Sequence, residues 1–162
     1  MPCPNLHKRS WEDDAQPEAH MPAAEDLDMG YGVAESLGLR SYMEDCHAVV
    51  LEASVANMLP GHSFFMVADG HGGTSVAQYL SEKLYSCLAD EVRTSGVGQL
   101  DAAVAEAALR SAYLAVDEQL PESCGTECGS TALTALVSRT DVVVANSGGC
   151  RIMCLDVRRL LS

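Results

Sequence analysis

The chain has 162 residues, 48% of them hydrophobic, which is typical of one globular domain that can bury a sizeable core. Its 23 acidic residues exceed its 10 lysines and arginines, so the formal net charge is −13. Because this charge repels phosphate backbones and anionic lipids, we expect neither nucleic acid nor a membrane among its partners.

The first 29 residues are predicted to form an acidic, disordered tail that precedes a single domain over residues 30–162. The tail contains four prolines and carries two basic against seven acidic side chains, a balance of −5. It has few apolar residues to bury in a core. It also lacks the apolar stretch of a secretory signal, and no run in the chain approaches the roughly 20 apolar residues of a membrane helix.

Seven cysteines are scattered through the chain. An odd number without an export signal indicates reduced, mostly buried thiols and a location in the cytoplasm, the nucleus or both. Cys124 and Cys128, like Cys150 and Cys154, are separated by three residues, and no histidine lies near either pair. This is not the spacing of a zinc site, so we expect no zinc.

Runs of β-branched and aromatic residues between turn residues predict three strands, over residues 31–36, 46–51 and 63–68. The dipeptide Pro60-Gly61 marks the turn before the third strand. These strands are short and follow one another closely, which favours antiparallel pairing.

Two segments with apolar residues at helical spacing come next. The first covers residues 74–92, with Thr74 or Ser75 as its N-cap. The second begins after Asp101, which can cap it, and is stopped by Pro121.

Three further strands are predicted over residues 130–137, 142–146 and 151–155, separated by turns at 138–141 and 147–149. The order of three strands, two helices and three strands predicts an α+β fold with antiparallel sheets and helices packed on one face.

The motif most informative about chemistry is VADGHGG at residues 67–73, at the end of an apolar strand. Here the Asp69 carboxylate and the Gly70 carbonyl offer the oxygen ligands that hard divalent cations prefer. The His71 imidazole, close by, can transfer a proton. A second polar cluster, RSYMED at residues 40–45, adds two acids and an arginine that can bind phosphate.

Four motifs occur in a specific order: RSYMED at 40–45, DGHGG at 69–73, GSTA at 129–132 and VVANSGGCR at 143–151. Over residues 32–156 the sequence therefore resembles the N-terminal half of the metal-dependent Ser/Thr protein phosphatases of type 2C, plant members in particular. The resemblance implies a four-layer α/β/β/α sandwich of antiparallel sheets flanked by helices. It also implies two Mg²⁺ or Mn²⁺ ions and the hydrolysis of phosphoserine and phosphothreonine in proteins.

The resemblance assigns four residues to the metal site. Asp69 matches the carboxylate that bridges the two ions, and Gly70 matches a backbone carbonyl ligand. Glu44 matches an acid that approaches one ion largely through water, and Asp45 is its neighbour in the second layer of contacts.

Two further residues are assigned to the reaction itself. Arg40 matches the arginine that binds the substrate phosphate, and His71 matches the proposed general acid for the leaving oxygen. Water activated by the ions would attack phosphorus in line, without a phosphoenzyme. A phosphoprotein or another signalling protein is the partner that this reaction implies.

The sequence departs from the family in two ways. Family members continue for roughly another hundred residues, and that part supplies two further metal-binding aspartates. We therefore expect residues 30–162 to be a truncated domain without its C-terminal half. In addition, Gly149-Cys150 stands where the family usually has Asp-Ser.

These departures predict a pseudophosphatase-like chain with little or no activity, because half of its metal site is absent. Two alternatives stay open: an active phosphatase in a longer or complemented form, and a non-catalytic binding or regulatory module. A chain too unstable to have a role is a further possibility. The substrate, the preferred ion and the oligomeric state are not determined by the sequence.

Overall fold

A computed structural model describes residues 29–52 and 58–154 of the chain. The acidic tail predicted for residues 1–29 lies outside these residues except for its last position. The elements, in chain order, are β1 (Cys46–Val50), β2 (Ser63–Ala68), β3 (Gly70–His71), α1 (Ser75–Thr94), α2 (Ala102–Glu118), a short 3-10 helix (Glu122–Cys124), β4 (Gly129–Ser130), β5 (Ala132–Val137) and β6 (Val142–Ser147).

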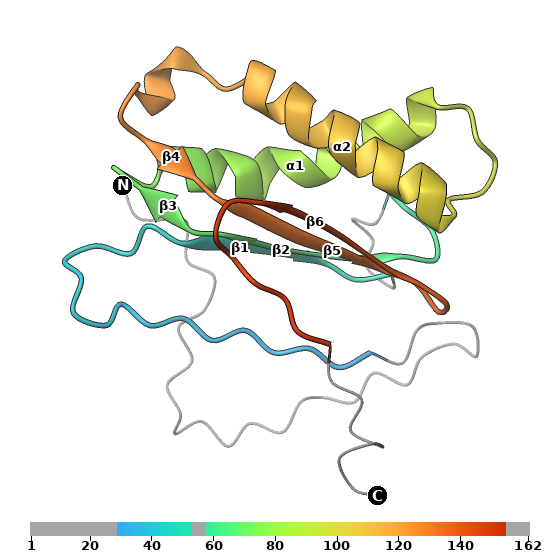
Figure 1. Cartoon of the computed structure of the whole chain (residues 1–162), viewed down its shortest axis with the longest axis horizontal. Helices are drawn as coiled ribbons and strands as arrows, with labels where there is room; N and C mark the ends of the chain where they lie inside the picture. The colour runs from blue at the N-terminus through green and yellow to red at the C-terminus, as the bar shows by residue number, and fades with distance from the viewer. Residues whose placement is uncertain (1–28, 53–57, 155–162) are drawn as a thin grey trace, which may run out of the picture.

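The main sheet has four strands in the order β1-β2-β5-β6, and every neighbouring pair is antiparallel. Strands β3 and β4 form a separate two-stranded sheet. Both long helices cover one face of the main sheet (Figure 1). The predicted α+β class with antiparallel sheets and flanking helices is therefore confirmed, and the described residues form two layers of the predicted four-layer sandwich.

The core lies between this sheet face and the helices. Alternate residues of β2 point into it, so that Phe64, Met66 and Ala68 are buried, whereas Phe65 is partly exposed and Val67 is exposed. Leu84 and Leu88 from α1 and Leu109 from α2 complete the same apolar cluster. Burying such side chains stabilises the fold by roughly 1.5–3 kcal/mol each.

The predicted helices are confirmed within two residues at each end. Asp101 caps α2 as expected, because its carboxylate accepts a hydrogen bond from the Val104 N–H at 2.9 Å. Thr74 occupies the N-cap position of α1, but its side chain makes no capping hydrogen bond.

Two predicted strands are wrong in the described residues. Residues 31–36 are irregular, as are residues 151–154 of the strand predicted for 151–155, whose last residue lies outside the described part. A strand needs a neighbour for its backbone groups, and sequence pattern alone does not supply one. Residues 29–45 instead run along the side of the main sheet that faces away from the helices (Figure 1).

Two side-chain contacts join that segment to the outer face of the sheet. The Tyr31 ring lies edge-on against Phe65 of β2, with ring centroids 6.1 Å apart. The Glu35 carboxylate lies 2.7 Å from the His47 Nδ1 on β1. Nevertheless, Val67, Val142 and Val144 remain exposed on the main sheet.

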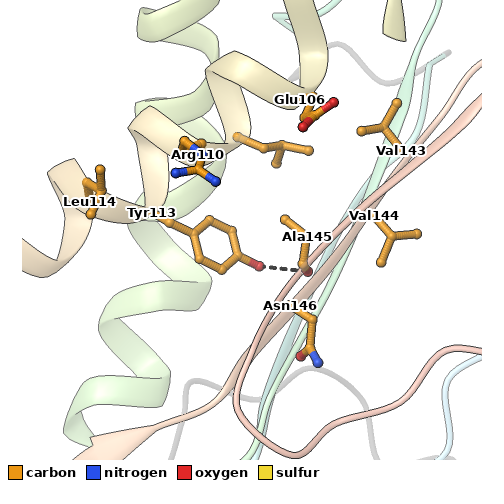
Figure 2. A pocket seen from close by; sticks show the side chains of 9 residues that line it. Glu106, Arg110, Tyr113, Leu114, Val143, Val144, Ala145 and Asn146 are labelled. Atoms are coloured by element: carbon orange, nitrogen blue, oxygen red, sulfur yellow. Dashed lines mark hydrogen bonds between the residues drawn. The ribbon is translucent and has the colours of Figure 1, made fainter. Parts of the chain in front are cut away.

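A shallow pocket of about 350 Å³ lies between α2 and β6. Figure 2 shows Glu106, Arg110 and Tyr113 of α2 facing Ala145 and Asn146 of β6 across it. The Tyr113 hydroxyl donates to the Ala145 carbonyl at 3.1 Å and thereby ties the helix to the strand. In the part of the chain that the structure describes, we find no helix with the length and apolar character needed to cross a membrane.

Candidate metal centre

The backbone of Asp69, directly after β2, is held by Thr131. The Asp69 N–H donates to the Thr131 Oγ1 at 3.0 Å, and the Thr131 N–H donates to the Asp69 carbonyl at 2.9 Å. The following residues, Gly70 and His71, pair as β3 with β4. Asp69 is thus fixed at the end of a central strand while its side chain remains exposed.

Gly70 brings the second predicted cluster against this loop. A Cβ atom at Gly70 would overlap the backbone carbonyl oxygen of Glu44, so only glycine permits this approach. The Gly73 N–H then donates to the Glu44 Oε1 at 2.7 Å. The two clusters, separate in sequence, are therefore adjacent in the fold.

The carboxyl groups of Asp45 and Asp69, one from each cluster, are close enough to influence each other. Partial burial raises the pKa of Asp45 above its ordinary value, and the negative charge of Asp69 raises it further. Smaller contributions in the same direction come from Glu35, from the hydrogen bond with Asp69, and from Glu44. Negative charge is concentrated here, and Asp45 therefore holds a proton to higher pH than usual.

This donor set fits a divalent cation in part. Hard cations prefer carboxylate oxygens, and a cation between Asp45 and Asp69 would relieve their mutual repulsion. The Glu44 carboxylate, however, already accepts from the Gly73 N–H. Among residues 29–52 and 58–154, no group of three or more histidines, cysteines and acids is arranged to hold a metal ion. The metal roles of Asp69, Gly70, Glu44 and Asp45 stay predictions.

The two residues predicted to act on the phosphate ester, His71 and Arg40, are both exposed and have different neighbours. The exposed His71 ring packs over Gly129, where an added Cβ would come within 2.8 Å of the His71 Cε1. Arg40 is also exposed, and its backbone N–H donates to the Leu37 carbonyl at 3.1 Å. Within the described residues, no ion pair joins the Arg40 side chain to the carboxyl pair. The catalytic roles of Arg40 and His71 stay predictions.

Three residues beside the site were given no role by the sequence. Thr131 holds the Asp69 backbone, and the Cys150 thiol lies 3.0 Å from the Thr131 Oγ1. The Cys128 thiol donates to the Gly72 carbonyl at 2.8 Å. The GSTA motif at residues 129–132 includes Thr131, but the motif alone does not show that Thr131 binds the backbone of Asp69. All six cysteines in the described residues are free thiols.

Comparison with known proteins places these features in a family. The sequence profile of the family "Protein phosphatase 2C" matches residues 29–159. The chain is 38% identical over 130 residues to "Probable protein phosphatase 2C 74" of Oryza sativa subsp. japonica, covering 75% of this chain and 31% of the relative. It is 32% identical over 139 residues to "Protein phosphatase 2C 56" of Arabidopsis thaliana, covering 76% and 32% of the two chains.

A solved structure supports the fold. The "serine-threonine phosphatase 2C from Toxoplasma gondii" superposes with a TM-score of 0.51 at 21% identity, covering 67% of this chain and 39% of that one. The chain spans about a third of the length of the curated relatives named above. The profile match, the identities and the fold agree, and the chain belongs to the protein phosphatase 2C family.

Proposed function

We propose that this chain carries part of a Mg²⁺- or Mn²⁺-dependent centre for hydrolysing phosphoserine and phosphothreonine in proteins, and that alone it has little or no activity. The observation that carries the proposal is the approach of the segment with Glu44 to the loop after Asp69. The Gly73 N–H donates to the Glu44 Oε1 at 2.7 Å, and a Cβ at Gly70 would overlap the Glu44 carbonyl oxygen, so two of the family motifs lie side by side.

Different residues of the chain would bind the cation, bind the phosphate and donate the proton. Asp45 and Asp69 would hold a cation, with the Gly70 carbonyl beside them and the Glu44 carboxylate approaching it through water. When bound, such ions neutralise phosphate oxygens and lower the pKa of water. Arg40 would bind phosphate oxygens through its planar fork of N–H donors, and His71 would protonate the departing serine or threonine oxygen.

The expected weakness of this activity rests on the number of ligands. Two firmly held ions need more oxygen ligands than one carboxyl pair with a carbonyl can offer. Within the described residues, no three histidine, cysteine or acidic side chains form a group that could hold a metal ion, and the relatives extend well beyond the matched region.

The test is hydrolysis of a phosphothreonine peptide by the purified 162-residue chain in Mn²⁺. We expect no turnover above the background rate. Asp69→Ala is compared with Asp117→Ala, which removes an exposed carboxylate from α2, an element that carries none of the residues assigned to the site. Turnover that disappears in Asp69→Ala but persists in Asp117→Ala would show a working phosphatase and contradict the proposed deficiency.

Titration calorimetry with Mn²⁺ tests the same proposal without catalysis. We expect weak uptake of a single ion, further weakened by Asp69→Ala and unaffected by Asp117→Ala. Tight uptake of two ions by the isolated chain would overturn the idea of an incomplete centre.

An active form is the second candidate, and it is favoured by the length of the relatives, of which the chain spans about a third. The chain would be joined to the remaining segment of the Oryza sativa relative. Mn²⁺-dependent turnover by this chimera that requires Asp69 would support it, and an inactive but folded chimera would count against it.

The partner implied by this chemistry is a phosphoprotein, and the free thiols suit a location in the cytoplasm or nucleus. A fluorescent fusion expressed in plant cells would test the location.

The non-catalytic role is supported by Val67, Val142 and Val144, which leave apolar surface exposed on the sheet. If the chain binds a protein partner and Asp69→Ala leaves that binding unchanged, the result would favour the non-catalytic role.

A further inference from the structure

We infer that Cys150 is a positioning residue for Asp69 and that it acts through Thr131. The inference rests on the proposed function, because it concerns the placement of the carboxylate assigned to the metal. It is carried by a continuous series of contacts from the end of β6 to the loop after β2.

The first step is the pair of hydrogen bonds between Thr131 and the Asp69 backbone. One residue accepts from the Asp69 N–H through its side chain and donates to the Asp69 carbonyl through its backbone. Both polar groups of the Asp69 backbone are therefore tied to Thr131. Any rotation of the Thr131 side chain removes the acceptor from the Asp69 N–H.

The second step is the contact between Cys150 and that same hydroxyl. The Cys150 Sγ lies 3.0 Å from the Thr131 Oγ1. The Thr131 oxygen already accepts from the Asp69 N–H, and the hydroxyl keeps its own O–H and a second lone pair, so it can donate to the Cys150 thiol or accept from it. This contact selects the side-chain rotamer in which Thr131 faces Asp69.

The third step is the turn that presents Cys150. Gly148 has a φ of +104°, and a Cβ there would come within 2.7 Å of the Thr131 Cγ2. The turn therefore packs directly on Thr131. The Asn146 side chain fixes the turn, since its Nδ2 donates to the carbonyls of Gly148 and Cys150 at 3.2 Å each. Figure 2 shows Asn146 at this end of β6.

These contacts make a specific prediction about substitutions. Cys150→Ala removes the partner of the Thr131 hydroxyl, whereas Cys150→Ser keeps a hydrogen-bonding group in its place. Thr131→Val removes the acceptor of the Asp69 N–H with almost no change of shape, whereas Thr131→Ser retains it. Cys154→Ala is the control, because Cys154 is an exposed thiol outside the series of contacts.

The first measurement is amide hydrogen exchange by NMR on the metal-free 162-residue chain. We expect the Asp69 amide to exchange roughly three- to tenfold faster in Thr131→Val, the range for one net hydrogen bond. A smaller increase is expected in Cys150→Ala, with wild-type exchange in both conservative variants and in Cys154→Ala. The amide of Leu136, in β5 between β2 and β6, should exchange at the wild-type rate throughout.

The second measurement is Mn²⁺ affinity by calorimetry. We expect Cys150→Ala to bind Mn²⁺ more weakly than the wild type and Cys150→Ser to restore the affinity. A wild-type chain that binds no Mn²⁺ would refute the proposed metal centre, and the exchange data would then decide the positioning inference alone. Unchanged Asp69 exchange in Cys150→Ala, or equal acceleration at Asp69 and Leu136, would overturn the inference.

Discussion

At the scale of single residues, the site depends on close backbone approach. Gly70 permits the segment carrying Glu44 and Asp45 to touch the loop that carries Asp69. The contact is steric, so it is sensitive to one added carbon atom. A backbone carbonyl cannot move aside as the end of a flexible side chain can, and its overlap with a new Cβ must displace the chain itself.

Gly70→Ala is therefore expected to destabilise the chain by about 1–3 kcal/mol, the usual cost of inserting atoms into a packed site. The free energy of unfolding in urea measures this effect. Gly98→Ala is the matched control, because no atom lies within 4 Å of a Cβ at Gly98. Equal stability of the two variants would show that the segment around Glu44 does not pack on the loop.

At the scale of elements, one side chain joins α2 to the sheet. The Tyr113 hydroxyl lies 3.2 Å from the Ala132 carbonyl and the Thr134 Oγ1, and 3.1 Å from the Ala145 carbonyl. It thereby reaches both β5 and β6. Burial raises the pKa of Tyr113, and the hydrogen bonds with Thr134 oppose this shift in part.

The raised pKa gives a dependence of stability on alkaline pH. Folded Tyr113 holds its proton more tightly than the unfolded residue, so its contribution to stability is constant below the ordinary tyrosine pKa of about 10 and is lost as the pH rises beyond it. Tyr113→Phe should remove this loss, while costing about 1 kcal/mol at neutral pH through the missing hydrogen bond.

Unfolding free energies measured between neutral and strongly alkaline pH check this prediction. Tyr42→Phe is the control, since the Tyr42 ring is 80% exposed, and it should retain the wild-type pH dependence. An alkaline loss of stability of the same size in Tyr113→Phe and the wild type would assign that loss to other groups, such as the thiols.

At the scale of the whole molecule, the two faces of the main sheet differ. One face is covered by α1 and α2, and the irregular segment over residues 29–45 runs along the other (Figure 1). Val67, close to the end of the central strand β2, is 49% exposed on that outer face. Apolar surface of this kind attracts hydrophobic dyes and other proteins.

Val67→Thr is expected to lower the binding of a hydrophobic dye while changing the free energy of unfolding by less than about 1 kcal/mol, because threonine keeps the β-branched shape. Dye fluorescence at fixed protein concentration measures the effect. Val97→Thr changes a side chain of similar exposure, 48%, in the loop between the helices. If both variants lower the fluorescence equally, the outer face of the sheet binds the dye no better than other exposed apolar side chains do.

Local features of this protein were predictable from its sequence. The strand over residues 63–68, both helices and the Asp101 cap follow from period, turn residues and capping chemistry, which act between neighbours along the chain. The family likewise follows from the order of its motifs. Such signals depend on residues close together in the sequence, so they can be recognised without knowledge of the fold.

Only the tertiary structure decided which distant segments meet. Residues 31–36 have the pattern of a strand but lie irregularly on the outer face, because a strand forms only where a partner offers free backbone groups. The contact of Gly70 with Glu44 and the hold of Thr131 on Asp69 join residues far apart in the chain. The sequence identified the chemical groups of the site, and long-range packing determined which of them lie within bonding distance.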